Sequence, residues 1–186
     1  MIALKSIQAE LNMIEEMINK DITFKTARLD ELVDLPLNGL EEKMCPAVFL
    51  AVNSLKGQSG YLTINLALIF QYVFLANRIH RLVTDEDVPE DVRQYSVLVG
   101  DFVFGQTFSR LCQEGIFKYT RDFIKAIETM NEGVLLRWRL KNKNIALKDY
   151  KLILGKERAY LTALAGRLGA QVSGIEESLV PKIEEF

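Results

Sequence analysis

Cysteine, proline, histidine and tryptophan are all scarce in this chain of 186 residues, which holds two cysteines, four prolines, one histidine and one tryptophan. Few prolines and a hydrophobic content of 49% are typical of one compact globular domain with a well-filled core. Cys45 and Cys112 have no CxxC partner, so we predict two reduced, mostly buried thiols. His80 lacks the ligand arrangement of a closed zinc site and is predicted to be a hydrogen-bonded structural residue.

An excess of charge of one sign is also missing. The chain has 23 basic and 25 acidic residues, and its net charge of −2 supplies no overall field for a nucleic acid partner. The amino terminus lacks the pattern of a secretory signal, and the most apolar segment, within residues 61–76, falls short of a membrane span. These observations predict a cytoplasmic protein without an integral membrane segment.

Apolar residues at helical spacing recur along most of the chain, and no credible pair of strands is present. The pattern predicts an all-α bundle of about eight helices in a single domain, residues 1–186. The expected helices cover about residues 1–20, 27–35, 40–57, 63–83, 90–113, 117–141, 147–154 and 156–174, with another turn or two in 175–186. Pro46 either kinks the third helix or marks its true start.

Four stretches resemble motifs of the trans-prenyltransferases, the polyprenyl diphosphate synthases. In the order of the chain they are "ANRIHRLVTDED", "SVLVGDFVFGQTFSRL", "MNEGVLLRWRL" and "LKDYKLILGKERAYLTALAGRLGAQVSG". The resemblance covers roughly residues 39–175. It implies the isoprenoid-synthase fold, and in that family carboxylates on facing helices hold the magnesium ions that neutralise a leaving diphosphate.

The first metal-binding motif of that family is degenerate here. A helix end that normally reads Leu-Ile-His-Asp-Asp-x-x-Asp has Arg81, Leu82 and Asp85 at its three acid positions. Asp85, Glu86 and Asp87 form a local acid cluster that a magnesium ion could visit. The ordinary alternative is a solvated helix end with a pair between Arg81 and Asp85, and we predict no metal site in this chain.

The family's basic segment for the incoming isopentenyl diphosphate has also lost binding groups in this sequence. Gly39, Lys43 and Pro46 match that segment, but Cys45 replaces an arginine and Glu42 a lysine. A carboxylate at that place repels a diphosphate. The family's Arg-Arg-Gly loop has no counterpart in this sequence.

Later positions follow the same trend. Arg137 stands where the family has glutamine and Glu157 where it has threonine. Lys156 is retained, and it either still reaches a phosphate or is a commonplace exposed lysine. The second aspartate-rich motif follows the small-residue helix in the family, and the chain reaches Phe186 without it.

With these groups replaced, we expect no catalytic residue and no bound cofactor in this chain. Within the family the profile resembles the small, non-catalytic subunit (component I) of heterodimeric heptaprenyl or hexaprenyl diphosphate synthases. That resemblance implies a full-length catalytic partner of the same fold, which binds Mg²⁺, and a joint long-chain product for the menaquinone side chain. Whether the isolated chain forms a homodimer stays open.

A subunit without chemistry can set product length through the side chains that it places against its partner. Phe102, Phe104 and Phe108 flank Gly105, whose missing side chain would allow close helix approach. The alternative is that these phenylalanines are ordinary core residues. Two other functions stay open: a degenerate but active synthase homodimer that uses the acids at 85–87, and a helical interaction module with an unrelated partner.

Overall fold

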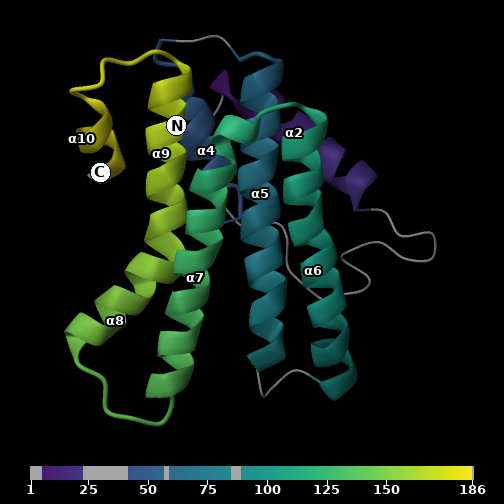
Figure 1. Ribbon diagram of the computed structural model, residues 1–186, viewed down its shortest axis with the longest axis vertical. Coiled ribbons are helices and arrows are strands. Elements are labelled where there is room, and N and C mark those ends of the chain that lie inside the picture. The colour runs from purple at the N-terminus through teal and green to yellow at the C-terminus, as the bar shows by residue number, and fades with distance from the viewer. Residues whose placement is uncertain (1–5, 23–41, 57–58, 85–88, 186) are drawn as a thin grey trace.

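The computed structural model describes residues 6–22, 42–56, 59–84 and 89–185, and all regular elements among them are helices (Figure 1). The α-helices are α2 (Gln8–Asp21), α4 (Met44–Asn53), α5 (Tyr61–Arg81), α6 (Glu90–Gln113), α7 (Thr120–Leu140), α8 (Leu147–Leu154), α9 (Tyr160–Val172) and α10 (Val180–Glu185). The short turns are η1 (Leu82–Thr84) after α5, η2 (Phe117–Tyr119) before α7, and η3 (Gly155–Ala159), a π-helical turn between α8 and α9. The all-α prediction of about eight helices is confirmed.

The helix boundaries follow the sequence pattern closely in the second half of the chain. Helix α6 has the predicted bounds, and the helix predicted at 27–35 lies outside the described residues. Helix α4 begins at Met44, so Pro46 lies in its first turn, where an amide donor has no partner within the helix. Pro46 therefore marks a helix start.

Helix α5 is the centre of the bundle. All residues from Thr63 to Asn77 are buried, and the helix contacts α2, α4, α6, α7 and α9. The Phe70 ring lies 5.5 Å from that of Phe49 and 5.0 Å from that of Phe123, which joins three helices through aromatic packing. In the described part of the chain, α5 alone is long and apolar enough to cross a membrane, but 83% of its apolar window is buried by the protein itself, as in a core helix.

A polar contact attaches α2 to the centre of the bundle. The Tyr72 hydroxyl on α5 donates a hydrogen bond of 2.5 Å to the Asp21 carboxylate at the end of α2, and Arg110 on α6 donates a second one. Burial and the neighbouring carboxylate raise the pKa of Tyr72, so the phenol stays protonated and keeps donating.

Helix α6 carries apolar side chains on both its buried and its exposed face. Its buried face, with Val99, Val103 and Leu111, packs on α5. The opposite face carries large apolar side chains that are 37% to 67% exposed; they are Tyr95, Leu98, Phe102 and Phe108. Cys112 lies one turn after Phe108 and is exposed, so the prediction of two buried thiols is wrong for this residue. Cys45, on α4, is buried as predicted.

Candidate functional site

The end of α5, the end of α7 and the π-helical turn η3 meet around one buried carboxylate. The Glu157 side chain on η3 is 0% exposed. Arg137 on α7 donates from Nε to Glu157 Oε1 at 2.9 Å and from Nη2 to Oε2. Arg81, the last residue of α5, places Nη1 3.6 Å from Glu157 Oε2. One carboxylate is thus shared by two guanidinium groups from different helices.

A glycine on α7 makes room for this arrangement. A Cβ atom on Gly133 would lie 2.7 Å from Cγ of Glu157 and 2.9 Å from Cβ of Lys156, closer than side-chain atoms approach. The π-helical turn η3 joins α8 to α9 here. Such turns are frequent at functional sites. Gly133 and η3 together let Glu157 enter the space between the helices.

A second buried carboxylate, that of Glu42, pairs with an arginine near the end of α5. Arg78, one turn before Arg81, places Nη1 2.7 Å from Oε1 of Glu42, whose side chain is 3% exposed. Glu42 lies two residues before Met44, the first residue of α4. The two arginines share one face of α5, because residues three apart are neighbours on a helix, and they pair with acids from two distant segments.

The retained lysine is also engaged. Lys156 Nζ lies 2.6 Å from Glu132 Oε2 on α7, and this hydrogen bond lowers the pKa of Glu132. Burial and the charge of Arg137 lower the pKa of Arg81, whose guanidinium stays protonated because its ordinary pKa is far above neutrality. Each carboxylate of the site, Glu42, Glu132 and Glu157, is therefore engaged by at least one cation of the protein.

These residues do not fit a magnesium ion. Among the residues that the structure describes, no three His, Cys, Asp or Glu side chains gather as metal ligands. Magnesium prefers carboxylate oxygens and water, whereas both buried carboxylates, Glu42 and Glu157, already accept from guanidinium groups. The predicted pair between Arg81 and Asp85 lies outside the described residues, as do Glu86 and Asp87. Leu82 begins η1 and packs against the core.

Sequence reasoning found these positions but missed that they pair. Arg81 and Glu157 carry opposite charges at two positions where the sequence departs from the family motif. Glu42 is a third such position, but its partner Arg78 was not singled out from the sequence. A signal was available, since a new base and a new acid at two degenerate positions suggest a pair. Their contact itself depends on how the helices pack.

His80 belongs to the contact between α5 and α6. Its Nε2 atom lies 3.2 Å from Asp101 Oδ1 and 3.4 Å from the carbonyl oxygen of Val97. Its ring centroid lies 5.2 Å from that of Phe104. These are the contacts of a hydrogen-bonded structural histidine.

Within this chain, a close approach between helices occurs at Gly100, whereas the approach of a partner at Gly105 stays a prediction. A Cβ atom on Gly100 would lie 2.1 Å from the His80 ring, so the two helices require glycine there. Around Gly105 nothing lies within 4 Å of that position, and the residue is exposed. Within this chain, Gly105 is therefore part of an open surface.

The three phenylalanines of α6 do not share one environment. Phe104 is half-buried and packs against the core, as the alternative for these residues predicted. Phe102 and Phe108 are 39% and 37% exposed and lie on the outer face with Gly105. Two of the three aromatic candidates, Phe102 and Phe108, therefore lie on the outer face of α6.

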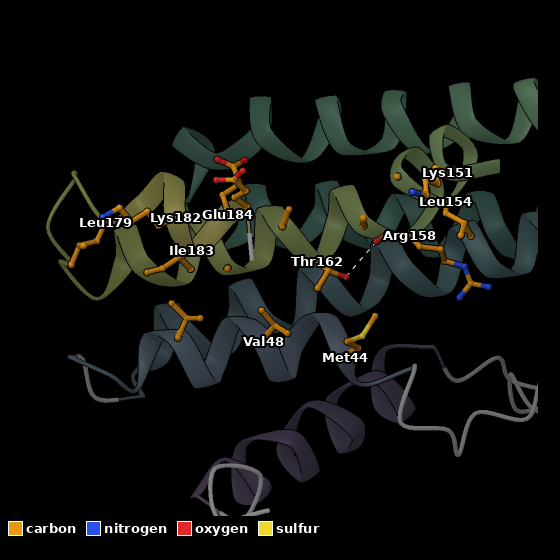
Figure 2. Close-up of a pocket in the computed structure, with 16 residues that line it drawn as sticks. Met44, Val48, Lys151, Leu154, Arg158, Thr162, Leu179, Lys182, Ile183 and Glu184 are labelled. Atoms are coloured by element: carbon orange, nitrogen blue, oxygen red, sulfur yellow. Dashed lines mark hydrogen bonds between the residues drawn. The ribbon is translucent and has the colours of Figure 1, made fainter. Parts of the chain in front are cut away.

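An apolar groove of about 1040 Å³ runs along α4 and α9 and is bounded by α8, η3 and α10. Figure 2 shows Val48 and Met44 on one wall, Thr162 on the other, and Ile183 near one end. Arg158 borders the opposite end. The groove is distinct in its lining residues from the Arg81, Arg137 and Glu157 cluster.

Similar proteins agree on one class of enzyme. No protein-family model matches the chain. The chain is 25% identical to geranylfarnesyl diphosphate synthase of Methanosarcina mazei over 187 residues, and 23% identical to octaprenyl diphosphate synthase of Escherichia coli over 185. These alignments cover 95% and 92% of this chain but 63% and 54% of the relatives, so the chain spans little more than half of their length.

Solved structures give the same answer for the fold. A decaprenyl diphosphate synthase from Rhodobacter capsulatus matches with a TM-score of 0.82 and 20% identity over 98% of this chain and 60% of that one. A mint heterotetrameric geranyl pyrophosphate synthase, a deletion mutant, matches with a TM-score of 0.68 and 18% identity over 97% of this chain and 77% of that one. The chain has the all-α isoprenoid-synthase fold, and its homologues and structural neighbours are trans-prenyl diphosphate synthases.

Proposed function

We propose that this chain is a non-catalytic subunit of a heterodimeric long-chain trans-prenyl diphosphate synthase that works in the cytoplasm. Its partner is a full-length synthase of the same fold, which binds the Mg²⁺ and carries out the chemistry. The joint product is a heptaprenyl or hexaprenyl diphosphate for the menaquinone side chain. This chain contributes no catalytic residue and no metal ligand.

The closed ion-pair cluster carries the proposal. Ionisation of an allylic diphosphate requires carboxylates that face metal ions and cations that face phosphate oxygens. At the corresponding place in this chain, Glu157 accepts from Arg137 at 2.9 Å and lies 3.6 Å from Arg81, while Glu42 pairs with Arg78 at 2.7 Å. Carboxylates that are already engaged by guanidinium groups of the protein are not free to coordinate magnesium.

The exposed apolar face of α6 is evidence for a protein partner. Tyr95, Leu98, Phe102 and Phe108 form an exposed apolar row on a helix whose other face is buried against α5. Exposed apolar patches of this kind mark protein interfaces, and aromatic residues are enriched in them. A neighbour of this fold is itself named a heterotetrameric synthase, which is a precedent for unlike chains in one assembly.

A physical role follows for the aromatic side chains on that face. A growing prenyl chain stops when its apolar tail meets a wall, and a subunit pressed against the catalytic chain can determine where that wall lies. Phe102 and Phe108 are 39% and 37% exposed on that face, whereas Phe104 packs against His80 and the core. Phe102 and Phe108 are therefore the proposed chain-length residues.

The experiment is a prenyl elongation assay with radiolabelled isopentenyl diphosphate, farnesyl diphosphate and Mg²⁺. We expect no turnover from this chain alone and long products when it is mixed with the full-length synthase homologue of the same cell. Turnover by the chain alone would contradict the proposal and favour an active homodimer. No effect of the chain on the synthase homologue would favour an interaction module with an unrelated partner.

The length of the product tests whether the exposed phenylalanines of α6 act as proposed. Phe102→Ala and Phe108→Ala in the mixed complex should shift the product distribution while leaving the chain folded. Phe117→Ala is the matched control, because Phe117 is an exposed phenylalanine outside α6 and should leave product length unchanged. An unchanged distribution for all three variants, with intact assembly, would remove the chain-length role.

A further inference from the structure

Positive charge is concentrated at one end of the molecule, in the hairpin formed by the end of α7 and by α8. Residues 135–152, called here the α7–α8 tip, hold six Lys or Arg and one Asp, a net charge of +5. The whole chain carries −2, so the remaining residues carry −7. Figure 1 shows the turn between α7 and α8 at one extremity of the long axis. The near-neutral total therefore hides a strongly basic end.

Most of these cations are available to an external partner. The side chains of Arg139, Lys143, Lys148 and Lys151 are exposed and make no ion pair with any residue in the described part of the chain. Arg137 differs, since it is paired with Glu157. The single acid, Asp149, accepts a hydrogen bond of 3.2 Å from the backbone N–H of Ala146 at the start of α8.

Large apolar side chains accompany the cations. Six of them in the tip are between 43% and 68% exposed; they are Leu135, Trp138, Ile145, Leu147, Tyr150 and Leu152. Leu135 and Trp138 are three residues apart on α7, and Leu147 and Tyr150 are three apart on α8, so each pair shares a helix face. Soluble surfaces rarely expose so many large apolar groups together without a partner.

We infer that the α7–α8 tip docks this chain onto the surface of an anionic lipid bilayer. Lys and Arg near such a surface are attracted by its negative potential. Tryptophan, tyrosine and leucine side chains are stabilised at the boundary between head groups and acyl chains. The tip offers both kinds of group on one short hairpin, and its helices are held by the bundle, so docking is peripheral.

A lipid surface fits these residues better than a nucleic acid does. Phosphates of a nucleic acid would satisfy the cations, but they would leave Leu135, Leu147 and Leu152 in water. A bilayer interface satisfies the cations and buries the leucines together. This inference does not rest on the proposed function, because the exposed cations that it uses, Arg139, Lys143, Lys148 and Lys151, lie outside the ion-pair cluster and outside the outer face of α6.

Trp138 provides a direct probe, because it is the single tryptophan of the chain and lies in the tip. The full chain is mixed with phosphatidylcholine vesicles and with vesicles that also contain phosphatidylglycerol. We expect a blue shift of tryptophan emission and protection from acrylamide quenching with the anionic vesicles alone, both lost at high salt. A blue shift of equal size with neutral vesicles would overturn the role of charge.

A triple variant tests which residues carry the binding. Lys143→Gln, Lys148→Gln and Lys151→Gln together should lower the partition coefficient on anionic vesicles roughly a hundredfold, at a factor of about five for each cation. The matched control removes three basic residues elsewhere, with Lys20→Gln, Lys118→Gln and Arg121→Gln. We expect this control to bind like the wild-type chain.

Three results would overturn the inference. The first is no change of emission with anionic vesicles, and the second is an equal loss of binding in the tip and control variants. The third is shielding of Trp138 by duplex RNA or DNA without any response to vesicles, which would assign the tip to a nucleic acid. Far-ultraviolet circular dichroism checks that each variant is folded, so a loss of binding reports on the surface.

Discussion

The candidate site depends on the carboxylate of Glu157. It is fully buried and accepts hydrogen bonds from Arg137 while Arg81 lies 3.6 Å away. A buried carboxylate is tolerated only where cations and hydrogen bonds compensate its lost hydration. Through these contacts Glu157 holds the ends of α5 and α7 to η3.

Replacing this carboxylate by its neutral isostere tests the arrangement. Glu157→Gln keeps the volume but leaves two guanidinium groups without a counter-charge. We expect the free energy of unfolding in urea to fall by about 2–3 kcal/mol, somewhat less than for wholly buried pairs because the Arg137 side chain is 46% exposed.

Glu128→Gln is the control for that measurement. Glu128 pairs with Lys125 at 2.9 Å, but both side chains are more than half exposed, so its removal should leave the urea midpoint unchanged. Equal midpoints for the Glu157→Gln and wild-type chains would show that the buried cluster contributes nothing to stability.

The two cysteines should differ sharply in reactivity. Burial raises the pKa of Cys45 to about 11, and Cys112 is exposed. Because the thiolate is the nucleophile, an aromatic disulfide reagent at pH 8 should label Cys112 quickly and Cys45 only after unfolding. Cys112→Ala should then be almost unreactive in native buffer. Rapid labelling of that variant would mean that Cys45 is more accessible than its place on α4 indicates.

At the scale of elements, glycines decide how closely the helices approach. Gly133 lets η3 lie against α7, and Gly100 lets His80 of α5 lie against α6. The sequence contains both glycines, but nothing local distinguishes them from Gly105, which faces open space. Only the packing of the neighbouring helix gives each its role.

Two alanine substitutions should therefore have opposite effects. Gly133→Ala places a methyl group 2.7 Å from Cγ of Glu157, and such overpacking should destabilise the chain by about 1–3 kcal/mol. Gly105→Ala meets nothing within 4 Å and removes a flexible residue from a helix interior, so it should stabilise the chain by about 0.5–1 kcal/mol. The midpoints of thermal and urea unfolding measure both. A stabilising Gly133→Ala would be incompatible with the described approach of η3.

At the scale of the whole molecule, the outer face of α6 and the α7–α8 tip are two separate surfaces. The first is apolar and aromatic, as expected of a protein partner, and the second is basic and apolar, as expected of an anionic lipid surface. Apart from Arg137, which pairs with Glu157, the residues of both surfaces lie outside the buried ion pairs. One bundle can thus present two surfaces while its charged cluster serves to hold helices together.

In the absence of the proposed partner, the isolated chain should self-associate through the outer face of α6. Leu98→Glu combined with Phe102→Glu places two charges on that face and should make the chain monomeric in sedimentation experiments. Leu55→Glu is the control, since Leu55 is an exposed leucine just after α4. Unchanged association of the double variant would place the contact elsewhere on the molecule.

The sequence by itself determined the all-α class, the bounds of α6 and the positions at which the synthase motifs are altered. Helical periodicity, caps and substitutions are local properties, so they can be read without knowing which helices meet. Burial of Cys45 was also predictable, but exposure of Cys112 was not, because it depends on which face of α6 is covered.

Only the tertiary structure decided that the altered positions pair. Glu42 meets Arg78, and Glu157 meets Arg81 and Arg137, although these residues are far apart along the chain. It also decided that Phe104 packs inward while Phe102 and Phe108 stay exposed. The physical reason is that contacts between distant residues and the exposure of a helix face follow from helix packing, which no local pattern specifies.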